Sequence, residues 1–273
     1  MKAPAVDYVR PRGLAEAVDL LAQANGEARV VAGGQSLIAM MNLRLASPGL
    51  LVDIARLPEL TAASHDADAV TLGACVTHAA IEDGRVPDPS RGLMRRVAAS
   101  LAYRAIRNRG TIGGSLALSD PAAEWPAVLS ALDAEVMVRG PNGQRSLNCA
   151  GFTTGIFESQ LASDEIIESV RIQKLSADTR WGYIKFCRKA GEFANALAVA
   201  VAGRGHCRVM LGAANGAPLM LDKTSQLVSN GVRDGVRDAV AADLNRAADR
   251  HFDEFQRQLH AVAAMRAVQQ MLQ

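Results

Sequence analysis

Two glycine-rich stretches decide how this sequence is interpreted: VVAGGQSL at residues 30–37 and RGTIGGSL at residues 109–116. Each pairs two adjacent glycines with a hydroxyl residue beside a predicted strand or helix. Glycine has no Cβ, so main-chain N–H groups in such a loop can close on a bulky anion and adopt positive φ. The first glycine loop (residues 30–37) and the second glycine loop (residues 109–116) could together hold the two phosphates of one dinucleotide.

The alternative is that both stretches are only tight turns. Neither fits the GxGxxG pattern of a Rossmann fold or the GxxxxGK[ST] pattern of a P-loop. A helix N-terminus after such a loop adds about 0.3–1 kcal/mol of attraction for an anion, which does not separate the two interpretations. The loops alone therefore indicate a possible anion site and nothing more specific.

Around the first glycine loop, the pattern predicts a small α/β unit over residues 1–57. Apolar residues at helical spacing predict a helix over 14–24, and Asn25-Gly26 is a fitting stop. Short apolar runs at 29–31 and 50–54 predict strands, with a helix over 36–45 between them.

A second unit is predicted over residues 58–176. Its strands are expected at 69–72, 135–139, 145–147 and 165–172, the middle two joined by a turn at Pro141-Asn142-Gly143. One helix is expected to begin after Thr77 as its N-cap, another to span 91–107, and a third to run from Pro121 to Leu132.

The third predicted unit covers residues 177–273. Strands are expected at 181–188 and 207–213, separated by a stretch of small residues at 194–202. The final helix carries one apolar face, made of Leu259, Val262, Met265, Val268 and Met271.

The composition excludes several function classes. The 273 residues carry a formal charge of only +2 and are 4% aromatic, which gives no case for a nucleic-acid surface. The four cysteines, Cys75, Cys149, Cys187 and Cys207, lie far apart, so an iron–sulfur cluster or metal site held by this chain is not expected. The sequence shows no signal peptide and no apolar run of about 20 residues, so we expect a cytoplasmic protein without a membrane span.

Three motifs in order point to a family. AGGQSL at 32–37, RNRGTIGGSLA at 107–117 with DPAAE at 120–124, and KAGEFA at 189–194 resemble the FAD-binding medium subunit of the molybdenum hydroxylases, the xanthine dehydrogenase and carbon monoxide dehydrogenase family. The resemblance extends over nearly the whole chain. It implies an α+β fold: a two-part FAD-binding domain of the PCMH (vanillyl-alcohol oxidase-like) type, then a smaller α+β C-terminal domain with a three-stranded sheet plus helices.

The resemblance also implies the residues that hold FAD. The two loops would wrap the diphosphate, Glu124 would touch a nucleotide hydroxyl, Lys185 would lie near the flavin ring, and Phe193 would cover one ring face. Ile167 would fill an apolar place beside the ring. The full implied set is Val31, Ala32, Gly33, Gly34, Gln35, Ser36, Leu37, Gly110, Thr111, Gly113, Gly114, Ser115, Glu124, Ile167, Lys185 and Phe193.

Each of the isolated residues has a plainer interpretation. Glu124 could simply stabilise a helix N-terminus, Lys185 could be an exposed lysine, and Phe193 could be a core aromatic. The arginines between Arg91 and Arg109 could raise the positive potential near the diphosphate or form a solvated helix face. Three departures from the family pattern, at Gln35, Leu118 and Trp125, remove no backbone donor, so FAD binding should survive them.

In that family the chemistry is divided among subunits. The resemblance implies that FAD in this chain takes electrons from two [2Fe–2S] clusters of a small subunit and passes them to an external acceptor. A large subunit would carry molybdopterin and hydroxylate the substrate, and the assembly would be (αβγ)2, a heterohexamer. No catalytic residue is assigned in this chain. A self-sufficient FAD oxidoreductase and a non-catalytic assembly subunit with a degenerate nucleotide site remain alternatives, and the substrate stays open among N-heterocycles, aldehydes and carbon monoxide.

Overall fold

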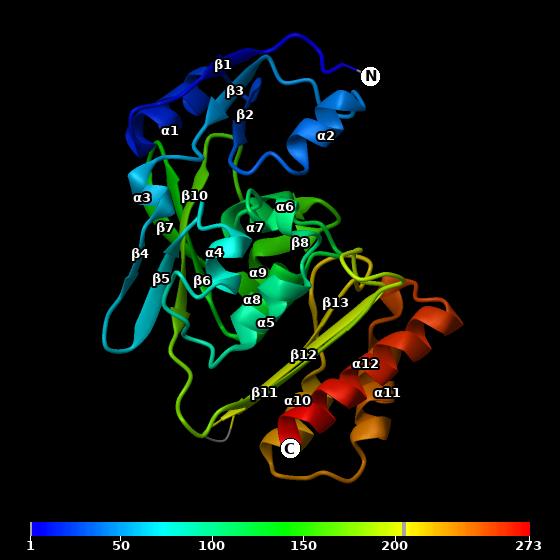
Figure 1. Cartoon of the computed structure of the whole chain (residues 1–273). Helices are drawn as coiled ribbons and strands as arrows, with labels where there is room; N and C mark the ends of the chain where they lie inside the picture. Colours follow the sequence, from blue (N-terminus) through cyan, green and yellow to red (C-terminus); the bar gives the residue numbers. More distant parts are fainter. Residues whose placement is uncertain (1, 204–205) are drawn as a thin grey trace.

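The computed structural model describes residues 2–203 and 206–273, and its first part is a small parallel sheet flanked by helices (Figure 1). The elements in chain order are β1 (Asp7–Val9), α1 (Leu14–Gln23), β2 (Ala28–Val31), α2 (Leu37–Asn42) and β3 (Leu50–Asp53). The strand order is β1-β3-β2, with Val9 beside Val52 and Val31 beside Asp53. All three strands are parallel, so the segments that follow them leave from the same edge of the sheet.

The middle part of the chain builds a five-stranded antiparallel sheet packed against helices. Its strand order is β4-β5-β10-β6-β7. The strands are β4 (Ala63–His65), β5 (Ala69–Gly73), β6 (Glu135–Gly140), β7 (Gly143–Asn148) and β10 (Ile166–Gln173), and β8 (Thr153–Gly155) pairs with β9 (Glu158–Ser159). The helices are α3 (Pro58–Thr61), α4 (His78–Glu82), α5 (Leu93–Ser100), α6 (Arg104–Arg107), α7 (Ile112–Leu118), α8 (Glu124–Ala131) and α9 (Cys149–Phe152).

The last part is a four-stranded antiparallel sheet with helices over one face (Figure 1). Its elements are β11 (Arg180–Phe186), β12 (Ala196–Gly203), β13 (His206–Gly212), β14 (Leu219–Met220), α10 (Asp222–Ser229), α11 (Val236–Arg246) and α12 (Glu254–Leu272), with a 3-10 turn at Ala248–Arg250. The C-terminal helix α12 lies so close to β11 that a Cβ on Gly182 would be 1.9 Å from the Ala267 carbonyl oxygen.

Strand β12 is shared by two hydrophobic cores. Leu197, Val199 and Val201 pack into the core of the middle part, whereas Ala196, Ala198 and Ala200 pack into the C-terminal core under α12. Successive side chains of a strand point to opposite faces, so one strand can serve both sides. The division into units at residues 57 and 176 stays a prediction, because the second and third units share a core across this strand.

The structure corrects three predictions about elements. The stretch 194–202 is not a connector but contains β12, so the C-terminal sheet has four strands in the described residues and not three. The predicted helix 91–107 is two helices, because Ala102 adopts a left-handed φ of 36° between α5 and α6. The helix expected from Pro121 begins only at Glu124, because the Asp120 carboxylate accepts the Ala122 N–H at 2.9 Å and forms a turn there.

Smaller differences concern the ends of elements. Helix α2 stops at Asn42 and does not reach residue 45, and Arg44 is left-handed with φ of 58°. On α12 the fully buried side chains include His260, Ala263 and Ala267, while the predicted Leu259, Val262 and Met265 are half-buried. Small residues let this helix approach the sheet closely, which shifts its buried face.

Candidate functional site

The first glycine loop joins the end of β2 to α2 at the carboxyl edge of the parallel sheet. Gly34 is left-handed with φ of 72°, a conformation that favours glycine. Within the described residues, no hydrogen bond uses the main-chain N–H groups of residues 33 to 36. The side-chain amide of Gln35 donates to the Gly33 carbonyl at 3.1 Å, which closes the loop on itself. This loop therefore presents a row of open N–H donors.

Two apolar residues fix the ends of this loop. Val31 is buried at the end of β2, and Leu37 packs beside it in a small cluster with Met41. Ala32, Gly33 and Gly34 are half-buried, and Gln35 is exposed. The donors are thus held on a framework that is anchored at both ends and accessible in the middle.

The second glycine loop leads from α6 into α7 and uses its amides differently. Thr111 is the N-cap of α7, and its hydroxyl accepts the Gly114 N–H at 3.0 Å. The Ile112 N–H donates to the Val76 carbonyl at 3.0 Å and the Gly113 N–H to the Ala74 carbonyl at 2.9 Å. The expected row of free amides is therefore absent at residues 112–114. This loop has Gly114 exposed and Ser115 half-buried, while Thr111, which carries the second hydroxyl, is buried.

The two loops are in contact with each other. A Cβ on Gly33 would lie 2.2 Å from the Arg109 carbonyl oxygen and 2.9 Å from the Gly110 Cα. Gly110 in turn packs on the His78 ring, and a Cβ on Gly113 would lie 2.5 Å from the Ala74 Cβ. Gly33, Gly110 and Gly113 are thus required by close packing of the chain on itself. At Gly34 and Gly114 a Cβ would meet only side-chain atoms, the nearest being those of Ile38 at 3.1 Å and of Thr111 at 2.8 Å, respectively.

Lys185 and Glu124 form a buried ion pair. The Lys185 Nζ lies 2.6 Å from Glu124 Oε1, and the two side chains are 6% and 3% exposed. The same ammonium donates to the Ser100 carbonyl at 3.1 Å. Burial raises the pKa of Glu124, and the neighbouring ammonium offsets part of that rise. Lys185 is therefore not an ordinary exposed lysine, and each charge of the pair depends on the other.

Phe193 and Ile167 occupy opposite environments. Phe193 is 61% exposed on the loop between β11 and β12, so it is not a core aromatic. Ile167 is 4% exposed in β10, where the register against β6 shifts between Ile167 and Ser169. Gly191 holds the Phe193 loop near residues 102–103, because its φ is 87° and a Cβ there would be 3.0 Å from the Ala102 carbonyl oxygen.

His78 is a site residue that sequence reasoning missed. Its ring lies against Gly110 and accepts the Trp125 indole N–H on Nδ1 at 3.1 Å. Its main-chain N–H donates to the Gly110 carbonyl at 2.9 Å. Burial, with the positive charge of Arg107 as a smaller cause, lowers the pKa of His78 to about 4. The departure at Trp125 thus has a structural account: the fully buried indole supports the histidine on which the second loop rests. At Leu118, the last residue of α7, nothing in the structure explains the departure.

Two arginines of the arginine-rich segment are paired with carboxylates of α4 and the residue after it. Arg104 pairs with Glu82 and Asp83, and Arg107 pairs with Glu82 at 2.8 Å. In the described part of the chain, no group of three or more His, Cys, Asp or Glu side chains is arranged to hold a metal ion. No helix within residues 2–203 and 206–273 is long and apolar enough to cross a bilayer.

These features fit a cofactor with a diphosphate. Open amides at a left-handed glycine provide the donors that a phosphate accepts, and the facing loop adds hydroxyls within a few residues. The family of the FAD binding domain in molybdopterin dehydrogenase matches residues 4–174. The chain therefore belongs to this family of FAD-binding oxidoreductase components.

Known proteins resemble the chain beyond that domain. The nicotine 6-hydroxylase medium subunit of Paenarthrobacter nicotinovorans is 39% identical over 193 residues, covering 71% of this chain and 67% of the relative. The carbon monoxide dehydrogenase medium chain of Hydrogenophaga pseudoflava is 35% identical over 196 residues, covering 72% and 68%. A solved structure of carbon monoxide dehydrogenase from Hydrogenophaga pseudoflava matches with a TM-score of 0.90 and 29% identity over 100% of this chain and 99% of that chain. The predicted family, fold class and FAD cofactor are confirmed.

Proposed function

We propose that this chain is the electron-transfer subunit of a molybdenum-containing hydroxylase and that it holds FAD across the two glycine loops. The carrying observation is the row of open N–H groups at residues 33 to 36, held against the second glycine loop by the contact of Gly33 with Arg109. When bound, FAD supplies a group that can accept electrons singly from [2Fe–2S] clusters of a small partner subunit and release them to an external acceptor.

The chain's own residues divide the work of holding the cofactor. Gly34, Gln35 and Ser36 present N–H donors to one phosphate, and Thr111 and Ser115 present hydroxyls to the other. Val31, Ala32 and Leu37 anchor the first loop, while Gly110 and Gly113 let the second loop pack closely. The remaining assignments, Glu124 toward a nucleotide hydroxyl, Lys185 near the ring, Phe193 over a ring face and Ile167 beside it, belong to the same proposal.

The buried ion pair gives the assignment of Lys185 a physical basis. The Glu124 carboxylate holds the Lys185 ammonium in one place, and the Ser100 carbonyl accepts a second hydrogen bond from it. Because Glu124 compensates its charge, Lys185 would act on the ring through oriented N–H donors of the pair and not through a net positive charge. The role of Glu124 is then to position Lys185 as much as to contact the nucleotide.

The proposal includes the assembly. A large subunit with molybdopterin would hydroxylate the substrate, a small subunit would carry the clusters, and the complex would be a cytoplasmic (αβγ)2 heterohexamer. In support, the relatives are named as medium subunits or chains, and they are named for compounds as different as nicotine and carbon monoxide. A subunit that relays electrons can stay similar while the substrate of a partner changes.

The experiment compares the isolated chain with the assembled complex. The purified full chain should be yellow and bind FAD one to one, and a chemical reductant should bleach the flavin. Substrate oxidation should appear only when the large and small subunits are added. Oxidation by the chain alone would favour a self-sufficient oxidoreductase, and a colourless chain that still assembles would favour a non-catalytic scaffold.

A further inference from the structure

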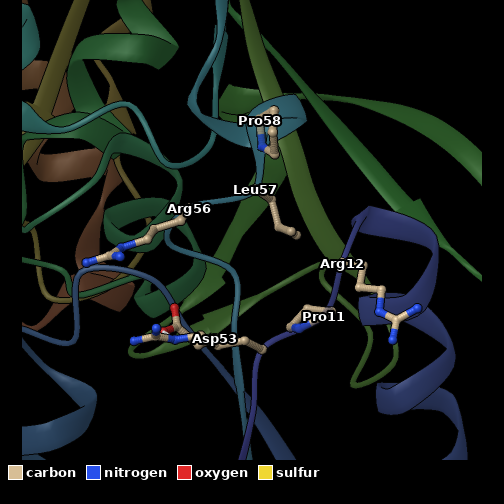
Figure 2. A pocket seen from close by; sticks show the side chains of 7 residues that line it. Pro11, Arg12, Asp53, Arg56, Leu57 and Pro58 are labelled. Carbon is tan, nitrogen blue, oxygen red and sulfur yellow. Dashed lines mark hydrogen bonds and ion pairs between the residues drawn. The ribbon is translucent and has the colours of Figure 1, made fainter.

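A separate basic pocket lies at the carboxyl edge of the N-terminal sheet. Its volume is about 150 Å³, and it is lined by Arg10, Pro11, Arg12, Asp53, Arg56, Leu57 and Pro58 (Figure 2). These residues follow β1 and β3, so they leave the sheet on the same side as the first glycine loop, which follows β2. The carboxyl edge of a parallel sheet is where open α/β folds bind their ligands.

The one acidic group that lines the pocket is saturated. Asp53 Oδ1 accepts the Ala55 N–H at 3.0 Å, and Oδ2 accepts from the Tyr8 hydroxyl and from Arg10 Nε. Burial alone would raise the pKa of Asp53, but these hydrogen bonds hold it below its ordinary value. The carboxylate is therefore ionised at neutral pH and compensates a single guanidinium, that of Arg10.

The remaining positive charge has no counterpart in the pocket. Arg10 donates from Nε to Asp53 at 3.2 Å and to the Tyr8 hydroxyl at 2.7 Å, and its guanidinium lies 5.6 Å from the centre of the Tyr8 ring; within the described residues, its terminal amino groups make no hydrogen bond. Within the described residues, the Arg56 side chain has no hydrogen bond or ion pair, and it is exposed. Figure 2 shows the Arg56 side chain extending to the same side as Asp53, while Arg12 extends to the other side.

Two other carboxylates, Glu16 of α1 and Glu59 of α3, accept hydrogen bonds from main-chain N–H groups at the start of α1. Glu16 accepts the Arg12 N–H at 2.7 Å, and Glu59 accepts the Leu14 N–H at 3.3 Å. The uncompensated charge is therefore concentrated on Arg56 and on the open end of Arg10.

From this arrangement we infer that Arg10 and Arg56 form a binding site for a single phosphate-class oxyanion. Guanidinium groups bind phosphate through paired N–H donors, and such charge-assisted bonds are about twice as strong as neutral ones. The pocket is smaller than the roughly 300–1,000 Å³ of sites for whole organic ligands, so it suits one oxyanion group. Because the proposed function places both phosphates of FAD at the two glycine loops, that group belongs to a separate phosphate-bearing molecule.

The test titrates inorganic phosphate into the FAD-loaded full chain by calorimetry, with Arg56→Gln as the variant. We expect a single site, and a loss of at least about tenfold in phosphate affinity for the variant, because one charge-assisted contact is removed. Arg44→Gln is the matched control: Arg44 is an exposed arginine of the same sheet unit outside the pocket, and its loss should leave phosphate affinity unchanged.

Flavin content distinguishes this site from the FAD site. If phosphate binds the FAD-loaded chain and Arg56→Gln keeps its flavin, the site serves a separate phosphate-bearing molecule. If phosphate competes with FAD and Arg56→Gln also weakens FAD binding, the pocket is part of the FAD site and the inference is overturned. The inference is overturned if neither form of the chain, with or without FAD, binds phosphate, or if Arg56→Gln and Arg44→Gln weaken it equally. FAD binding by the parent chain is read independently, so the proposed function stands or falls separately.

Discussion

The two glycine loops have similar sequences, but their main-chain N–H groups differ in whether they are hydrogen-bonded within the protein. In the first, the amides of residues 33 to 36 are open and Gly34 is left-handed. In the second, the amides of residues 112 to 114 are hydrogen-bonded to Val76, Ala74 and the Thr111 hydroxyl. The first loop therefore presents main-chain N–H donors, whereas the second is fixed by its own hydrogen bonds and contributes side-chain hydroxyls.

The difference comes from what lies behind each loop. The first follows the edge strand β2 of the parallel sheet, and within residues 2–203 and 206–273 no carbonyl accepts the N–H groups of residues 33 to 36. The second lies over residues 74–78, whose carbonyls accept its amides and whose histidine ring supports Gly110. A glycine pair in a sequence therefore does not say whether it serves a ligand or the packing of the chain.

The largest expected effect is at the contact between the loops. In Gly33→Val, the new Cβ would lie 2.2 Å from the Arg109 carbonyl oxygen, so the loops must separate. We expect loss of bound FAD and a fall of about 3 kcal/mol in the free energy of unfolding, the upper part of the range for overpacking. Flavin absorbance and urea unfolding measure the two effects.

Gly49→Ala is the matched control for that variant. A Cβ on Gly49, in the same unit, would approach no atom closer than the Glu27 carbonyl oxygen at 3.8 Å, an ordinary contact. This control should retain both FAD and stability. A Gly33→Val chain that also retains both would show that the loops need not touch.

The second expected effect separates the two glycines of the second loop. In Gly113→Ala, the Cβ would meet Ala74 at 2.5 Å, so unfolding free energy should fall by about 1–3 kcal/mol while folded chains keep FAD. In Gly114→Leu, the Cβ would lie 2.8 Å from the Thr111 hydroxyl oxygen, so that hydroxyl must shift, and the leucine at this exposed position should fill the phosphate site and release FAD. Unfolding curves and flavin content of both variants decide the comparison, and the reverse pattern would contradict it.

The third effect concerns how the free energy of unfolding depends on pH through His78, the residue on which the second loop rests. The folded pKa of His78 is about 4, below its ordinary 6.5, so folding favours the neutral ring. The contribution of neutral His78 to the free energy of unfolding is complete well above pH 6.5 and declines as the pH falls from 6.5 to 4. At pH 5 the loss is about 2 kcal/mol. Burial likewise lowers the pKa of the fully buried His260 to about 4, so it titrates in the same range.

Removing His260 isolates that effect. In His260→Leu, the remaining acid sensitivity should belong mainly to His78 and should decrease further in His260→Leu with His78→Gln. Unfolding curves at pH 7 and pH 5 give the change for each chain. Equal acid sensitivity in the single and double variants would exclude His78 as its source.

The smallest effect concerns two hydroxyls. Thr111 caps α7, so Thr111→Val should lower the unfolding free energy by about 1 kcal/mol. Ser36 makes no capping hydrogen bond, so Ser36→Ala should stay within about 0.5 kcal/mol of the parent. Both should weaken FAD binding by a few-fold. A stability loss for Ser36→Ala equal to that of Thr111→Val would remove the contrast between the loops.

Much of the fold follows from local sequence signals. The Asn25-Gly26 stop, the Thr77 cap and the turn before Gly143 are each found where the pattern predicts them. Strand β12 was missed because its alternating alanines resemble a connector of small residues. Only α12, which packs closely on that sheet, makes alanine the right size there. The break at Ala102 carries no glycine or proline signal.

The site shows the same limit. Motifs identified the loops, but the pairing of Lys185 with Glu124 joins residues 61 positions apart on different elements, which no local pattern encodes. The use of the amides in the second loop was also not predictable. It depends on the carbonyls of Ala74 and Val76, and their position is set by the fold of the middle sheet.

The shared strand β12 sets the order of events during synthesis. The core of the middle part includes Leu197, Val199, Val201 and Met210, which leave the ribosome well after residue 176. A nascent chain that ends before these residues exposes the apolar faces they will cover, a state prone to association with other chains. The part of the sequence that carries the second glycine loop, whose Ile112 and Leu116 lie in this core, therefore completes its folding only when most of the C-terminal sheet has been made.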